Sequence, residues 1–167
     1  MKVIVKKGDI EKHATNVLVI PIFSDVEQRD EDFSKIDNVL GRAMSQGMED
    51  NPYLTKENAL NMFFTNKRVR ADRVLLAGLG QSDKLTTESI RKLGGNIAKH
   101  LKGKNAKDIS VLGFGLGLKN IDLDKAIQSL VEGVLLGNYN FDTYKTKDKE
   151  NKDKEQGIET LQLIPQN

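Results

Sequence analysis

The chain has 167 residues, 30% of them charged, and 26 Lys and Arg against 24 Asp and Glu leave a net charge of +2. A hydrophobic content of 38% with a mean hydropathy of −0.48 excludes a membrane protein and indicates one globular domain over residues 1–167. The balanced charge argues against a general nucleic-acid binder. The absence of cysteine excludes disulfides, thiolate zinc sites and cysteine nucleophiles, and it fits a cytoplasmic protein.

The first third of the chain predicts two strands, an acidic loop and a helix. Val3–Val5 and Asn16–Phe23 are short apolar runs, and the second is apolar at consecutive positions, as in a central strand covered on both faces. Asp25–Asp32 holds five acidic residues and no glycine, which favours a solvated loop over a calcium loop. The helix is predicted from the spacing of Ile36, Val39, Leu40 and Ala43, with Ser34 or Asp37 as its cap and Gly47 or Asn51-Pro52 at its end.

The middle of the chain predicts two strands and a second helix. Asn58–Thr65 alternates apolar and polar residues like a half-buried strand, whereas Arg73–Gly78 reads as a buried one. Thr86 or Thr87 can cap the helix that follows. Its apolar face consists of Ile90, Leu93, Ile97, Ala98 and Leu101.

The last third predicts a buried strand at Asp108–Phe114, a third helix and a final strand at Ile158–Ile164. Asp122 or Asp124 should cap the helix and Gly137 should end it. Its apolar face consists of Ile127, Leu130, Val131, Val134 and Leu135. Because helices alternate with buried strands, the fold class is α/β: a three-layer α/β/α sandwich with a mixed sheet.

Few residues indicate chemistry. His13 and His100 lie in no metal-binding arrangement, and both are expected on the surface. The sequence contains neither a nucleophile elbow nor a phosphate loop. No catalytic, cofactor-binding or metal-binding residue is therefore assigned.

Two other clusters have more than one interpretation. The basic residues Lys67, Arg68, Arg70 and Arg73 either guard an edge strand or attract phosphate. Glycines follow two predicted strands, and they either make tight turns or expose amides to a phosphate. They are Gly78, Gly80, Gly113, Gly115 and Gly117, and neither group completes the Gly-x-Gly-x-x-Gly pattern. We favour the turns.

Near the end of the chain, Lys145–Glu155 contains five lysines and four acids and is expected to be an exposed, mobile loop. Tyr139, Phe141 and Tyr144 precede it. These aromatic residues either seal the core of the domain or face a neighbouring domain or subunit, in which case the chain should form weak dimers.

Three segments resemble the N-terminal domain of the leucyl (cytosol) aminopeptidase family. They are Ala71–Gly80 (ADRVLLAGLG), Leu85–Gly95 (LTTESIRKLGG) and Glu132–Lys145 (EGVLLGNYNFDTYK). The resemblance implies a macro-domain-like fold that precedes a separate catalytic domain with two divalent metal ions, zinc or manganese. The catalytic motif Asn-Thr-Asp-Ala-Glu-Gly-Arg does not occur in this sequence, which ends about where the connection to that domain is expected.

The resemblance therefore predicts a domain that is not itself an enzyme. Its partners would be the catalytic domain of the same polypeptide and the other subunits of a hexamer, and its role would be assembly or access to the active sites. One alternative is a macro-like module that binds ADP-ribose or a nucleotide, supported by the glycine turns. A weaker alternative is DNA binding through Lys67–Arg73.

Overall fold

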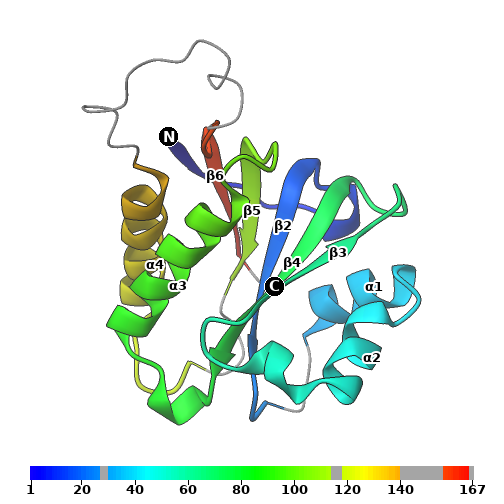
Figure 1. The fold of residues 1–167 in the computed structure, drawn as a ribbon, viewed down its shortest axis with the longest axis horizontal. Coiled ribbons are helices and arrows are strands. Elements are labelled where there is room, and N and C mark those ends of the chain that lie inside the picture. The colour runs from blue at the N-terminus through cyan, green and yellow to red at the C-terminus, as the bar shows by residue number, and fades with distance from the viewer. Residues whose placement is uncertain (27–29, 114–117, 140–155, 166–167) are drawn as a thin grey trace.

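The computed structural model describes residues 1–26, 30–113, 118–139 and 156–165. The structure is an α/β domain in which helices cover both faces of a six-stranded sheet (Figure 1). The strands are β1 (Lys2–Val5), β2 (Thr15–Phe23), β3 (Leu60–Phe64), β4 (Ala71–Gly80), β5 (Asp108–Leu112) and β6 (Thr160–Ile164). The helices are α1 (Glu31–Val39), α2 (Ala43–Asp50), α3 (Thr87–Leu101) and α4 (Leu123–Asn138), with short 3-10 turns η1 (Ile10–Lys12), η2 (Pro52–Thr55) and η3 (Ser82–Lys84).

The sheet is mixed, as predicted. Its strand order is β1-β6-β5-β2-β4-β3, and only β3 at one edge runs antiparallel to its neighbour. β2 pairs with both β4 and β5, so the prediction that this strand is central and buried is confirmed. The helices α3 and α4 each connect two parallel strands, from β4 to β5 and from β5 to β6.

Each face of the sheet has its own core. On one face Val17 and Val19 of β2 pack under α3 and α4. On the other face Leu18 and Ile20 pack under α1 and α2. The alternation follows from the strand period of two residues, and it explains why β2 is apolar at consecutive positions. All five residues of the apolar face predicted for α3 are buried.

The prediction of one continuous helix around Ile36–Ala43 is wrong, because the structure has two helices there, α1 and α2. Gly41 and Arg42 adopt positive φ values of 68° and 63°, which end α1 and begin α2. The buried Asp37 accepts hydrogen bonds from the backbone N–H groups of Met44 (2.9 Å) and Ser45 (3.2 Å). Asp37 is thus a cap, as predicted, but of the second helix rather than of its own.

The acidic segment Asp25–Asp32 is only partly a loop. Asp30 is the N-cap of α1 and accepts a hydrogen bond of 2.6 Å from the backbone N–H of Phe33, while Glu31 and Asp32 form the first turn. Acidic residues are favoured there by the helix dipole, so the prediction of a solvated loop is wrong for the last three residues of this segment.

The prediction that Gly137 ends the third helix is also wrong. It lies inside α4, which continues to Asn138, and it is buried. A Cβ atom at Gly137 would lie 2.5 Å from the carbonyl oxygen of Gly95 in α3. The glycine therefore serves helix packing.

Candidate functional site

The prediction that His13 is a surface residue is wrong. Its side chain is only 6% exposed, and Nε2 lies 2.9 Å from the hydroxyl oxygen of the buried Ser110 in β5. Burial and the charge of Lys6 lower the pKa of His13, whereas a contact with Gln162 opposes the shift. His13 directly follows η1, and Ile10 of η1 is buried in the core. The packing of Ile10 therefore places the imidazole ring of His13 next to Ser110 of β5.

His100 is partly exposed near the end of α3. Its Nε2 lies 3.1 Å from the ammonium nitrogen of Lys104, and partial burial together with that charge lowers the pKa of the ring. The two histidines lie in different parts of the fold, and their described polar contacts include no carboxylate. Neither has the surroundings of a catalytic base.

The described residues contain no group of three His, Cys, Asp or Glu side chains that could hold a metal ion. The resemblance assigns the two metal ions to a separate catalytic domain, and no reaction step through a metal is derived for this chain. The described helices also include none that is long and apolar enough to cross a membrane.

The glycines of β4 permit close backbone approach. A side chain at Gly78 would collide with the carbonyl oxygen of Lys56, and the backbone of Gly78 exchanges hydrogen bonds with the segment before β3. Gly80 has a φ of +72°, a turn conformation that favours glycine. Gly113 donates a hydrogen bond of 2.8 Å to the carbonyl oxygen of Ile164, while Gly115 and Gly117 lie outside the described residues.

The turns after β2 and β4 are tied together by side chains. Asp25, two residues beyond β2, accepts hydrogen bonds from the backbone N–H and the hydroxyl of Ser82, which lies two residues beyond β4. The carboxylate of Asp25 thus accepts the hydrogen bond of the Ser82 N–H group. A phosphate at this edge of the sheet would need backbone N–H groups of this kind.

The basic cluster divides between two roles. Arg73 in β4 donates hydrogen bonds to the carbonyl oxygens of Lys104 (2.9 Å) and Asn105 (3.1 Å), so it fastens the turn after α3. Lys67, Arg68 and Arg70 are exposed in the turn between β3 and β4, next to the edge strand. That position agrees with the interpretation as charges guarding an edge strand.

The crossing of α3 and α4 is a close backbone contact. Cβ atoms added at Gly94, Gly133 or Gly137 would collide with backbone atoms of the opposite helix. The helix backbones touch there because all three glycines lack a side chain. These glycines fall within the segments that resemble the aminopeptidase family. Glycine inside a helical pattern is the sequence signal that could have indicated their role in helix packing.

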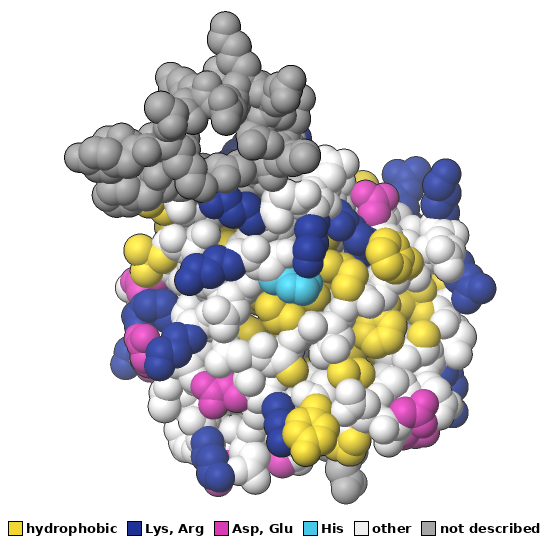
Figure 2. Space-filling view, viewed as in Figure 1, with side chains coloured by type: hydrophobic (Ala, Val, Ile, Leu, Met, Phe, Trp, Pro, Cys, Tyr) yellow, Lys and Arg dark blue, Asp and Glu magenta, His cyan; other side chains and the backbone are white. Residues whose placement is uncertain are grey.

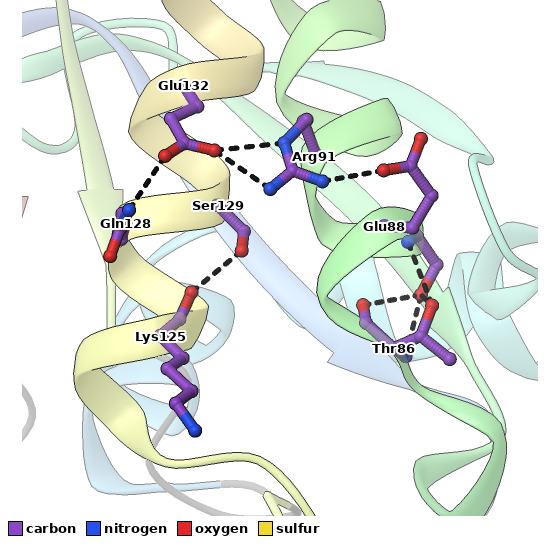
Figure 3. A network of polar contacts seen from close by, with 8 residues as sticks. Thr86, Glu88, Arg91, Lys125, Gln128, Ser129 and Glu132 are labelled. Atoms are coloured by element: carbon purple, nitrogen blue, oxygen red, sulfur yellow. Dashed lines mark hydrogen bonds and ion pairs between the residues drawn. The ribbon is translucent and has the colours of Figure 1, made fainter.

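A polar network covers this crossing at the surface (Figure 3). The Nη2 atom of Arg91 in α3 lies 2.8 Å from Oε2 of Glu132 in α4, and the Nη1 atom lies 2.6 Å from Oε2 of Glu88. Gln128 donates a further hydrogen bond of 2.8 Å to Glu132. Gln128 and Arg91 lower the pKa of Glu132, which keeps the carboxylate charged.

Several large apolar side chains of the described residues are exposed, and the three with the largest exposed fractions lie at two places. Figure 2 shows one group on the face over β3 and β4, where Leu60 and Met62 are half-buried and Phe64 is 71% exposed. The second place is the end of α4, where Leu136 and Tyr139 are both 70% exposed. Of the three aromatics that were expected to seal the core or face a neighbour, Tyr139 is thus outside the core. Phe141 and Tyr144 lie outside the described residues.

Comparison with solved structures defines the class of domain. A mutant of tomato leucine aminopeptidase superimposes with a TM-score of 0.75 at 18% identity, covering 98% of this chain and 32% of that one. The macrodomain of Mycobacterium tuberculosis DarG superimposes with a TM-score of 0.68 at 10% identity, covering 99% of this chain and 97% of that one. The fold is therefore that of a macrodomain and of part of a leucine aminopeptidase.

Sequence comparison identifies the family. The pattern of the cytosol aminopeptidase family, N-terminal domain, matches residues 19–148, and the chain belongs to this family as its N-terminal domain. A probable cytosol aminopeptidase of Geobacter sp. (strain M21) is 33% identical over 150 residues, which are 90% of this chain and 29% of the relative. A probable cytosol aminopeptidase of Alkaliphilus oremlandii is 25% identical over 164 residues, covering 98% of this chain and 32% of the relative. The chain thus spans about a third of the length of these relatives.

Proposed function

We propose that the chain is the non-catalytic N-terminal domain of a metal-dependent leucyl aminopeptidase, a cytoplasmic hexamer that removes N-terminal amino acids from peptides. The observation that carries this proposal is the family match over residues 19–148, together with the 29% and 32% of the relatives' lengths that the chain covers. Two zinc or manganese ions would act in the catalytic domain, where they would activate water for attack on the peptide carbonyl.

Within that enzyme, the domain would contribute to assembly or to access to the active sites. The exposed apolar side chains Phe64, Leu136 and Tyr139 support this role, because apolar groups at a surface favour contact with another polypeptide. The domain would then act as a binding partner, and the chemistry would belong to the catalytic domain.

The test compares the chain alone with a joined protein, in which the chain precedes the part of the Geobacter sp. relative that follows the matched region. The chain alone should release no chromophore from leucine p-nitroanilide with Mn²⁺ or Zn²⁺, whereas the joined protein should release it and sediment as an oligomer. Activity of the purified chain that survives removal of host peptidases would overturn the proposal. A joined protein that is active but monomeric would overturn the assembly role alone.

The macrodomain-like fold favours one second candidate, a module that binds ADP-ribose or a nucleotide. The support for this alternative is the fold and not the sequence, because the sequence identity to the two solved macrodomains is 13% and 10%. Titration with ADP-ribose separates the two candidates.

A further inference from the structure

The outer edge of β3 is an open edge of the sheet. β3 is the last strand in the order, and among the described residues its one neighbouring strand is β4. Two hydrogen bonds bracket this antiparallel pair. The backbone N–H of Gly78 donates to the carbonyl oxygen of Ala59 at 2.8 Å. The backbone N–H of Thr65 donates to the carbonyl oxygen of Asp72 at 3.3 Å.

These two bonds determine which backbone groups of β3 face outward. Hydrogen-bonded pairs recur at every second residue of an antiparallel ladder, so Asn61 and Phe63 direct their N–H and C=O groups toward β4. The N–H and C=O groups of Leu60, Met62 and Phe64 therefore point away from the sheet. The side chains of these three residues lie on the face covered by α3, where the first two are half-buried and Phe64 is exposed. A strand added here would meet unpaired backbone groups and apolar side chains together.

The strand itself lacks the features that usually keep an edge from pairing. Natural edge strands carry charged side chains, proline or a bulge. The sequence of β3 is Leu-Asn-Met-Phe-Phe, and its register with β4 is continuous from Leu60 to Phe64. Charged residues follow only in the turn after the strand. The edge is therefore open along its length and charged at one end.

The charges at that end are all positive. Lys67, Arg68 and Arg70 are exposed in the turn, and the chain has no acidic residue between Glu57 and Asp72. None of the three basic residues forms an ion pair with the described residues. Because the net charge of the whole chain is only +2, this local excess would select a partner by charge.

We propose that the edge of β3 binds an extended acidic segment of another polypeptide, which adds a strand to the sheet. The backbone of the segment would pair with the outward groups of β3, as in other cases of strand addition. Its apolar side chains would extend the apolar group over β3 and β4 that Figure 2 shows. Its carboxylates would face Lys67 and Arg68. The inference goes beyond the proposed function, because it defines a partner by shape and charge and does not depend on a role in assembly.

A second copy of this chain is the less suitable occupant. Two β3 strands paired antiparallel about Met62 would place Glu57 of one copy opposite Lys67 of the other. The same register would place Lys56 opposite Arg68. The attractive and the repulsive pair would offset each other. An acidic segment meets positive charge alone at this end of the strand.

Peptide binding tests the charge preference. The probe is a synthetic peptide with two glutamates at each end of a Val-Thr-Val-Thr-Val core, so that an acidic end reaches the turn in either strand direction. Fluorescence anisotropy at low salt should show that it binds at least about tenfold more tightly than the same peptide with lysines in place of the glutamates. Lys67→Glu combined with Arg68→Glu should reverse this preference. The matched control, Lys92→Glu with Lys99→Glu, changes the net charge equally on the exposed side of α3 and should keep the preference.

Amide hydrogen exchange, resolved by residue, locates the binding site without any variant. In the free chain the amides of Met62 and Phe64 should exchange at least about tenfold faster than those of Asn61 and Phe63, which face β4. The acidic peptide should slow the exchange of Met62 and Phe64 and leave that of Asn61 and Phe63 unchanged.

Four outcomes overturn the inference. They are absence of binding, equal binding of the two peptides, binding that leaves Met62 and Phe64 unprotected, and protection of these amides in the free chain. Protection that rises with protein concentration alone would assign the edge to a second copy and would also overturn it. None of these results bears on the activity of the joined protein, so the proposed function is judged separately.

Discussion

The carboxylate of Asp25 holds Ser82 by two hydrogen bonds, 2.9 Å from its backbone nitrogen and 2.8 Å from its hydroxyl oxygen. The two residues are 57 positions apart in the sequence, so this contact joins the ends of β2 and β4. Ser82 is 2% exposed, and its amide and hydroxyl are both satisfied within the chain.

Ser82→Ala should therefore destabilise the domain by about 1 kcal/mol, because it removes one hydrogen bond to a charged acceptor and leaves the backbone bond in place. Thermal denaturation should show a decrease of roughly 2–4 °C in Tm. Ser89→Ala, which removes a hydroxyl from the exposed capping box of α3, provides a comparison at the surface. An unchanged Tm for Ser82→Ala would show that the contact does not stabilise the fold.

The same contact predicts the outcome of a ligand titration. Because Asp25 occupies the Ser82 amide and adds a negative charge beside it, a pyrophosphate at this edge of the sheet would meet repulsion. Calorimetry with ADP-ribose at submillimolar concentration should show no specific heat. A one-site isotherm that Asp25→Ala strengthens would favour nucleotide binding over assembly or access as the role of this domain.

Gly94 and Gly95 form a matched pair of neighbours with opposite expected effects. Gly94→Ala should destabilise the domain by about 1–3 kcal/mol, because the new methyl group would collide with the backbone of α4. Gly95→Ala should stabilise it by up to roughly 1 kcal/mol, because alanine favours the helix and finds room there. Urea denaturation in dilute protein measures both, and destabilisation by Gly95→Ala would mean that α3 and α4 lie closer than the structure indicates.

His13 predicts a pH dependence of stability. Its pKa in the folded state is lowered, so the unfolded chain binds the proton first as the pH falls. The contribution of the buried neutral ring to the free energy of unfolding is fully present above the unfolded pKa of about 6.5. It is lost as the pH falls from there through the lower pKa of the folded state. His100 shifts in the same direction, so the measurement needs the two single variants.

His13→Gln should reduce the loss of unfolding free energy between pH 7 and pH 5, and His100→Gln should reduce it separately. Denaturant titrations at several pH values give both differences. If the His13→Gln protein loses as much stability as the unchanged chain over this range, then burial of the ring does not control its titration.

The sequence alone determined the α/β class, the order of the strands along the chain and most of the buried faces. The spacing of the apolar residues carries this information. Asn16–Phe23 is apolar at consecutive positions because the strand is buried on both faces, and Ile90–Leu101 has helical spacing because the helix is buried on one face. The match over residues 19–148 confirmed the family to which Ala71–Gly80 and Glu132–Lys145 pointed.

Only the tertiary structure decided what the polar residues and glycines do. The burial of His13 against Ser110 depends on β2 and β5 being neighbours, although these two residues are 97 positions apart. The role of Gly137 depends on the distance between α3 and α4, and Asp37 caps a helix whose start is fixed by the left-handed turn at Gly41 and Arg42. Such contacts join residues that local periodicity does not relate, so their partners appear only when the chain is folded.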